Sequence, residues 1–223
     1  MQFDYAYMLG LFPILLKYLG TTMGMAVIGM MFALILAIII ANIRIFKVPV
    51  LNGICQLYIS FFRGTPLLVQ MFLFYYGLPQ LIPVLVGINA FTAAVIALTL
   101  HFAAYMTESI RAAIIGIDHS QMEASLSIGM TTSQAMRRII LPQAARIAFP
   151  SLVNYFIDMI KSTSLAFTLG VAEMMATAQT EASSSFKYLE AFLAVALIYW
   201  AIVVILTRIQ LFTEQKLNKA YQR

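Results

Sequence analysis

The chain has 223 residues, of which 62% are hydrophobic and only 10% are charged. Soluble domains carry roughly 45–50% apolar and about 25% charged residues, so this composition excludes an ordinary soluble protein and indicates a polytopic membrane protein. The formal net charge of +5 does not indicate nucleic-acid binding, because the basic residues are scattered beside apolar segments, as at a cytoplasmic membrane surface.

The N-terminal residues lack the pattern of a removable signal peptide. Asp4 and Lys17 interrupt the first stretch, and no basic region precedes a short apolar run. We therefore expect the first span itself to direct membrane insertion. The single cysteine, Cys55, has no disulfide partner and no neighbouring metal ligands, and the 14 methionines lie mostly in apolar segments, so we interpret both as packing residues.

Apolar segments long enough to cross a membrane follow one another along the chain, since a spanning helix needs about 20 mostly apolar residues. We predict five spans, at residues 22–43, 57–81, 89–111, 147–168 and 191–207. Glycines and prolines between residues 77 and 87 separate the second span from the third. The second helix either begins at Thr65, with Pro66 at its first helical position, or is kinked there.

The distribution of Lys and Arg predicts the orientation of these spans. The loops of one side hold Arg44, Lys47, Arg111, Arg137, Arg138, Arg146, Arg208, Lys216, Lys219 and Arg223. The other side holds only Lys17 and Lys187. We therefore predict that the N-terminus lies outside and the C-terminus in the cytoplasm. The polar segment between the third and fourth spans is then cytoplasmic as well.

That polar segment, about residues 116–142, predicts two short helices. Ser120 and Glu123 have the spacing of a capping box, which places a helix start near residue 121. Gly129 can adopt the left-handed conformation that ends such a helix.

A second capping box is predicted from Thr131 and Gln134, and Pro142 is expected to stop the helix that follows. In the first helix, the sequence Glu123-Ala124-Ser125 places a charge beside two small residues. This combination suits close approach by another protein with a basic surface.

The same segment resembles the cytoplasmic coupling loop of ABC importer permeases, which reads Glu-Ala-Ala, Gly six residues after the Glu, and then Ile-x-Leu-Pro. The matching positions are Glu123, Ala124, Ser125 in place of the second Ala, Gly129, Ile139, Leu141 and Pro142. Residues 62–70, 104–111 and 161–165 resemble further motifs of the polar amino acid (histidine, glutamine and cystine) subfamily. The resemblance covers about residues 20–210.

This resemblance implies an all-α fold, a type I ABC importer transmembrane domain with five transmembrane helices that forms one domain over residues 1–223. It implies a multi-pass location in the bacterial inner membrane and uptake of a polar amino acid. It also implies three kinds of partner protein: a second permease subunit, ABC ATPase subunits and an extracytoplasmic solute-binding protein. Residues 174–179 and the Ser-rich loop after them resemble sulfur amino acid permeases, so we expect cystine as the substrate.

The chain itself has no motif for nucleotide hydrolysis. Lys161-Ser162 looks like the end of a phosphate-binding loop, but Ile160 occupies the position that requires glycine. We therefore expect a transport subunit rather than an enzyme, with no cofactor or metal in this chain. ATP and Mg²⁺ would be bound by a separate ATPase.

Ionisable residues inside predicted spans are the candidates for a substrate pathway. Asp158 and Lys161 lie three residues apart on one helix face, where they either neutralise each other or meet the two charges of an amino acid. The resemblance adds Thr163 and Ser164 from the Lys-x-Thr-Ser-Leu motif.

The third span carries a polar stripe of His101, Tyr105 and Glu108. We interpret His101 as a packing residue. Glu108 either pairs with Arg111 or, like Tyr105, lines the pathway.

Between the last two spans lies a polar segment that either docks the binding protein or is a solvated loop. It contains Glu173, Gln179, Thr180, Glu181 and Ser183 to Ser185.

Two other functions fit parts of the pattern. One is an ion- or proton-coupled carrier acting without an ATPase, with Asp158, Glu108 and His101 as a relay. The other is a membrane scaffold that transports nothing. Neither explains the coupling-loop motif.

Overall fold

The computed structural model describes residues 3–219, and the described chain is helical without any strand. Its elements in order are α1 (Tyr5–Leu16), α2 (Leu19–Ile45), α3 (Leu51–Gly64), α4 (Leu67–Phe72), η1 (Leu73–Gly77), η2 (Leu78–Gln80), η3 (Pro83–Leu85), α5 (Ala90–Ile115), α6 (His119–Ser127), α7 (Thr132–Ala135), η4 (Met136–Ile140), α8 (Leu141–Ser162), η5 (Thr163–Leu169), α9 (Met174–Ser185) and α10 (Tyr188–Lys219). Arg223 and the side chain of Lys219, which entered the charge count, lie outside the described part.

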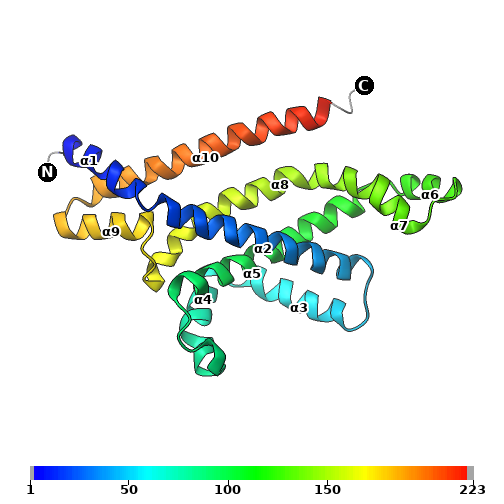
Figure 1. Cartoon of the computed structure of the whole chain (residues 1–223), viewed down its shortest axis with the longest axis horizontal. Coiled ribbons are helices and arrows are strands. Elements are labelled where there is room, and N and C mark those ends of the chain that lie inside the picture. The colour runs from blue at the N-terminus through cyan, green and yellow to red at the C-terminus, as the bar shows by residue number, and fades with distance from the viewer. Residues whose placement is uncertain (1–2, 220–223) are drawn as a thin grey trace.

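The long helices run roughly along one direction, as Figure 1 shows. Helices α1 and α9 lie at one end, and α6 and α7 lie at the other. Near the middle, α4 leaves the bundle sideways (Figure 1). The short helices α6 and α7 are therefore separated from α9 by the whole length of the bundle.

The centre of the bundle is a core shared by α2, α4, α5, α8 and η5. Small residues dominate where the helices meet, among them Ala33 and Ala37 on α2 and Ala97 on α5, all fully buried. At Gly29 a Cβ atom would lie 3.0 Å from Sδ of Met159 on α8. Helices in lipid gain most from such close contact, because no hydrophobic force drives their association there.

Three described helices are long and apolar enough to cross a membrane: α2, α5 and the Tyr188–Leu217 part of α10. A further span results if α3 and residues 67–80, which are bent by 112° at their junction, are counted together. The predicted fourth span, residues 147–168, falls on α8, which carries Asp158 and Lys161 and is not among these helices; the α-helix ends at Ser162, and residues 163–169 form the 3₁₀ helix η5. Five spans and their orientation remain predictions.

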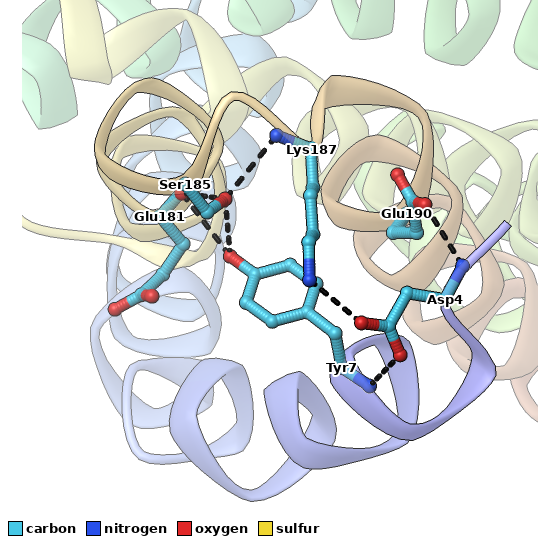
Figure 2. A network of polar contacts seen from close by, with 6 residues as sticks. All are labelled: Asp4, Tyr7, Glu181, Ser185, Lys187 and Glu190. Carbon is cyan, nitrogen blue, oxygen red and sulfur yellow. Dashed lines mark hydrogen bonds and ion pairs between the residues drawn. The ribbon is translucent and has the colours of Figure 1, made fainter. Parts of the chain in front are cut away.

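Two helices that the sequence did not predict, α1 and α9, pack with α10 in a second core built around Leu11, Leu15, Met174 and Ala178. Figure 2 shows the polar contacts that join them. Asp4 caps α1 and accepts a hydrogen bond of 2.6 Å from Nζ of Lys187, which lies in the turn before α10.

The same corner contains further contacts between α1 and the two later helices. The amide of Asp4 donates to Glu190 (3.0 Å), and the hydroxyl of Tyr7 lies 2.8 Å from that of Ser185 (Figure 2). The hydrogen bond from Lys187 lowers the pKa of the Asp4 carboxyl, and Asp4 in turn raises the pKa of Lys187. The N-terminal helix is thus attached to the α9–α10 corner.

Candidate functional site

The first of the two short helices begins earlier than predicted. Asp118 is its N-cap and accepts a hydrogen bond of 2.9 Å from the amide of Ser120, which lowers the pKa of the Asp118 carboxyl. Because this carboxylate already occupies the cap position, the helix starts at His119, and the predicted capping box of Ser120 with Glu123 is wrong.

The other local predictions for this segment have mixed outcomes. Gly129 has a φ of 84°, as predicted for the residue that ends α6. Thr131 and Gln134 form the predicted capping box, with contacts of 3.3 and 2.9 Å. Pro142 does not stop the helix. The chain continues through the π-turn η4 into α8, and Pro142 comes shortly after this irregular turn.

We call residues 118–142 the short-helix tip. Glu123, Ala124, Gly129 and Pro142 are exposed there, whereas Ser125 is buried and donates its hydroxyl hydrogen to the Gln121 carbonyl at 2.6 Å. Large apolar side chains are exposed beside them, namely Leu126 (44%), Ile128 (77%) and Leu141 (39%). An exposed carboxylate among exposed apolar groups is suited to contact with another protein.

An ion-pair cluster joins α2 to the tip-side half of α5. Glu108 accepts two hydrogen bonds from Arg111, at 2.7 and 3.1 Å, and forms a salt bridge of 3.3 Å with Arg44 from α2. The local pairing of Glu108 with Arg111 is thus confirmed, and Arg44 adds an interhelical contact that spacing alone did not predict. All three side chains are mostly buried.

The break between α3 and α4 is supported by side chains. Thr65 and Pro66 are both extended, and for Thr65 the cause is that a residue before proline avoids the helical region. Of the two predicted alternatives, the kink is confirmed by the bend of 112°, and the helix start at Thr65 is wrong, since Thr65 ends α3 and its hydroxyl donates back to the Phe61 carbonyl at 2.8 Å. The carbonyl of Arg63 accepts a longer hydrogen bond, 3.4 Å, from the Tyr105 hydroxyl.

Gln70 completes this support. Its side chain is fully buried, and Nε2 lies 3.0 Å from the Phe62 carbonyl and 3.1 Å from that of Thr65. On its other side Oε1 lies 3.0 Å from Nδ1 of His101 on α5. Unpaired backbone groups cost several kcal/mol in hydrocarbon, so the hydrogen bonds from Gln70 to these carbonyls lower the cost of a helix break within an apolar segment.

Tyr105 is the centre of an aromatic and polar group. Cζ of Arg63 lies 5.3 Å from the centre of its ring, and the His101 ring centre lies 5.1 Å away on the α5 side. The Tyr155 ring of α8 is at 6.2 Å, and its hydroxyl lies 2.9 Å from that of Ser109. This group joins the break between α3 and α4 to α5 and α8.

The remaining candidates lie at the far end of α8. Asp158 and Lys161 form a salt bridge of 2.6 Å and are each about half exposed. The hydroxyls of Thr163 and Ser164 donate to helix carbonyls at 2.7 Å. Lys161 and Ser164 also line a cavity of about 350 Å³ with residues of α9 and α10.

The predicted pathway residues therefore form two groups. Tyr105 and Glu108 lie on α5, whereas Asp158, Lys161, Thr163 and Ser164 lie on α8 and η5, and no hydrogen bond or salt bridge within residues 3–219 joins the two groups directly. Gln70, Ser109 and Tyr155 were missed as site residues. The sequence signals for Gln70 were its place at the end of the motif over residues 62–70 and a polar side chain within an apolar run.

Glu173 was predicted to lie in a polar segment that is either a docking surface or a solvated loop, but the structure places it in the interior. Its carboxylate is fully buried, caps α9 through the amide of Ala176 at 2.7 Å, and accepts from the Tyr199 hydroxyl at 3.3 Å. The exposed polar residues of this segment, among them Thr180 and Ser183, lie on α9 itself. In the described chain no group of three or more His, Cys, Asp or Glu residues is arranged to hold a metal ion.

Comparison with known proteins agrees with this architecture. Residues 29–219 match the family described as "Binding-protein-dependent transport system inner membrane component". The chain is 77% identical over 223 residues to the "Probable amino-acid ABC transporter permease protein PatM" of Vibrio harveyi, with 100% of both chains covered.

Two further similarities extend this result. The chain is 40% identical over 216 residues to the "L-cystine transport system permease protein TcyL" of Bacillus subtilis (strain 168), covering 95% of this chain and 90% of the relative. A solved structure described as "Crystal structure of an amino acid ABC transporter with histidines" has a TM-score of 0.90 and 32% identity, covering 97% of this chain and 100% of that chain.

Proposed function

The chain belongs to the family of binding-protein-dependent transport system inner membrane components, and from this membership we propose that it is the permease subunit of an ATP-driven importer of a polar amino acid. It is a multi-pass protein of the bacterial inner membrane. In the proposed complex it pairs with a second permease subunit and two ATPase subunits. An extracytoplasmic binding protein delivers the substrate at the α9 end.

The observation that carries the proposal is the short-helix tip. It combines Glu123, Ala124 and Gly129 with the exposed apolar side chains of Leu126 and Ile128, at the end of the bundle opposite α9 (Figure 1). We infer that the ATPase docks there, and that its ATP-dependent closure moves the tip and rocks the attached helices between outward and inward access. The tip then lies in the cytoplasm, in agreement with the Lys and Arg distribution.

The substrate pathway in this proposal uses the two groups of polar residues within the bundle. Asp158, Lys161, Thr163 and Ser164 form one group, and Tyr105 and Glu108 belong to the other. We propose cystine as the first substrate to test, because one relative is named as an L-cystine permease and residues 174–179 resemble sulfur amino acid permeases.

The test replaces Glu123 by Ala and Gly129 by Ala in the assembled importer. Removing the carboxylate takes away the charge offered to the ATPase, and a Cβ at a φ of 84° costs about 1 kcal/mol of local strain. We expect both variants to insert in the membrane normally while cystine uptake and binding-protein-stimulated ATP hydrolysis fall together.

Glu214→Ala, which removes a carboxylate on α10 outside the tip, is the matched control and should transport normally. Normal uptake by both tip variants would contradict the proposal. Full uptake by the chain alone in ATP-free vesicles, driven by an ion gradient, would establish the ion-coupled carrier instead.

A further inference from the structure

The break between α3 and α4 leaves one cation without a counter-ion. Arg63, in the last turn of α3, has an exposed guanidinium that forms no salt bridge within residues 3–219. The neighbouring Arg44 and Arg111 share the single carboxylate of Glu108. Arg63 lies against Tyr105, which is three residues before Glu108 on α5, so this part of the described bundle holds three guanidinium groups and one carboxylate, an excess of positive charge that favours an anion.

The hydrogen bonds of Gln70 decide which nitrogen of His101 carries a proton. Nε2 of Gln70 faces only oxygen atoms, those of Phe62 and Thr65, so it must be the amide donor and Oε1 the acceptor. The atom 3.0 Å from Oε1 is Nδ1 of His101, which must therefore donate. In the neutral ring Nε2 is then unprotonated and remains an acceptor.

Arg63 and His101 lie against the same aromatic ring. The Arg63 Cζ is 5.3 Å from the ring centre of Tyr105, and the His101 ring centre is 5.1 Å from it. The guanidinium of Arg63 is planar and can donate two hydrogen bonds to a carboxylate, whereas Nε2 of His101 is an acceptor that can receive a hydrogen bond from an ammonium group. In transporters, solute sites commonly form at discontinuous membrane helices, where backbone and side-chain polar groups converge.

We propose that this break is the subsite for the backbone charges of an amino acid, with Arg63 binding the α-carboxylate and Nε2 of His101 accepting a hydrogen bond from the α-ammonium. Gln70 is a positioning residue, because it fixes the His101 tautomer. The inference rests on the proposed function, since it names how the importer recognises its substrate class.

The experiment measures equilibrium binding of radiolabelled L-cystine, L-arginine and L-glutamine to the complete permease–ATPase complex in nanodiscs, without the binding protein. Arg63→Gln should weaken binding of the amino acid about ten- to a hundredfold, the value of a lost charge-assisted pair. The affinity of Arg63→Lys should lie between those of the wild type and Arg63→Gln, since lysine keeps the positive charge but lacks the paired N–H donors of the guanidinium.

Analogues separate a binding role from a structural one. The first analogue is the amino acid amide, in which a neutral carboxamide replaces the α-carboxylate. The wild-type complex should bind this amide more weakly than it binds the amino acid, and Arg63→Gln should not change the affinity for the amide. His101→Asn keeps an amide donor near the position of Nδ1 but has no acceptor at that of Nε2. The His101→Asn substitution should therefore weaken binding of the amino acid, but it should not change binding of the second analogue, the deaminated acid, which lacks the α-ammonium. Arg208→Gln, on α10, is the control and should bind as the wild type does.

The possible outcomes are distinct. If the wild type binds an amino acid and both Arg63→Gln and His101→Asn bind it equally well, the subsite is wrong and the proposed function stands. If both variants weaken the amino acid and its analogues alike, the residues are structural and the subsite is again wrong. If the wild type complex binds none of the three amino acids, the proposed function fails together with the inference.

Discussion

Gln70 offers the sharpest test of how the broken span is held together. Replacing it by Leu keeps the side-chain volume but removes the donor to the carbonyls of Phe62 and Thr65 and the acceptor for His101. Gln70 itself is fully buried, so the substitution removes a buried hydrogen-bond partner from both carbonyls. With about 1–3 kcal/mol for each carbonyl left unpaired, we expect Gln70→Leu to destabilise the protein by about 2–6 kcal/mol.

The measurement is the temperature at which half of the detergent-solubilised protein loses its monodisperse state. Gln80→Leu is the matched control. Gln80 lies in η2, shortly after α4, its side chain is exposed, and it donates a hydrogen bond of 2.9 Å to the Tyr76 carbonyl. Its effect should stay within about 0.5 kcal/mol, as for most surface substitutions. If the two variants lose their monodisperse state at the same temperature, the side-chain support described for the break is wrong.

Three further substitutions test other contacts. Glu108→Gln removes the charge that balances two guanidinium groups at 2.7 and 3.3 Å, and should lower the midpoint in the same assay by the equivalent of about 1–3 kcal/mol; no shift would show that the cluster does not stabilise α2 against α5. Gly29→Val places a Cβ 3.0 Å from Sδ of Met159 and should cost about 1–3 kcal/mol, whereas an unchanged midpoint would argue against this close helix contact. The Asp4–Lys187 pair should protect α1 from proteolysis in a pH-dependent way, since the pKa of Asp4 is lowered from 3.8 and the pKa of Lys187 is raised from 10.5. Protection should be complete between pH 3.8 and pH 10.5. It should be lost as the pH falls through the lowered pKa of Asp4, and also as the pH rises through the raised pKa of Lys187. Asp4→Asn should be cleaved faster than the wild type at neutral pH and equally fast in acid, and equal rates at neutral pH would contradict the anchoring role.

The sequence predicted the parts of the fold that depend on local composition. Long charge-free stretches predicted α2, α5 and α10; the actual ends of α2 and α5 lie within four residues of the prediction, whereas α10 continues to Lys219, well beyond the predicted end at residue 207. Gly129 and the capping box of Thr131 with Gln134 were also predicted, since each depends only on residues within one turn. The helices α1 and α9 were missed because their burial depends on packing with α10, which no local pattern announces.

Errors arose where two local signals competed. Asp118 and Ser120 are both good N-caps, and the sequence spacing favoured the box of Ser120 with Glu123. In the structure the carboxylate two residues earlier accepts the amide of Ser120 itself, so the helix starts before the box can form. Pro142 was misjudged in the same way, because a proline that would stop one helix is also suited to the first turn of the next.

The candidate site illustrates why polar residues in a membrane protein cannot be assigned a role from sequence alone. Some of them are consumed by the fold: the hydroxyls of Thr163 and Ser164 donate to their own helix carbonyls, and so can offer a solute only acceptor lone pairs. Asp158 and Lys161 already neutralise each other.

Which groups remain free is decided by contacts between helices far apart in the chain. Gln70 orients His101, which lies 31 residues later in the sequence. Arg44 forms a salt bridge with Glu108 on another helix, and Arg63 has no carboxylate partner in the described chain. Of the basic residues beside the two groups of pathway candidates, Arg63 therefore forms no salt bridge within residues 3–219, whereas Lys161 would first have to release Asp158 to bind a substrate carboxylate.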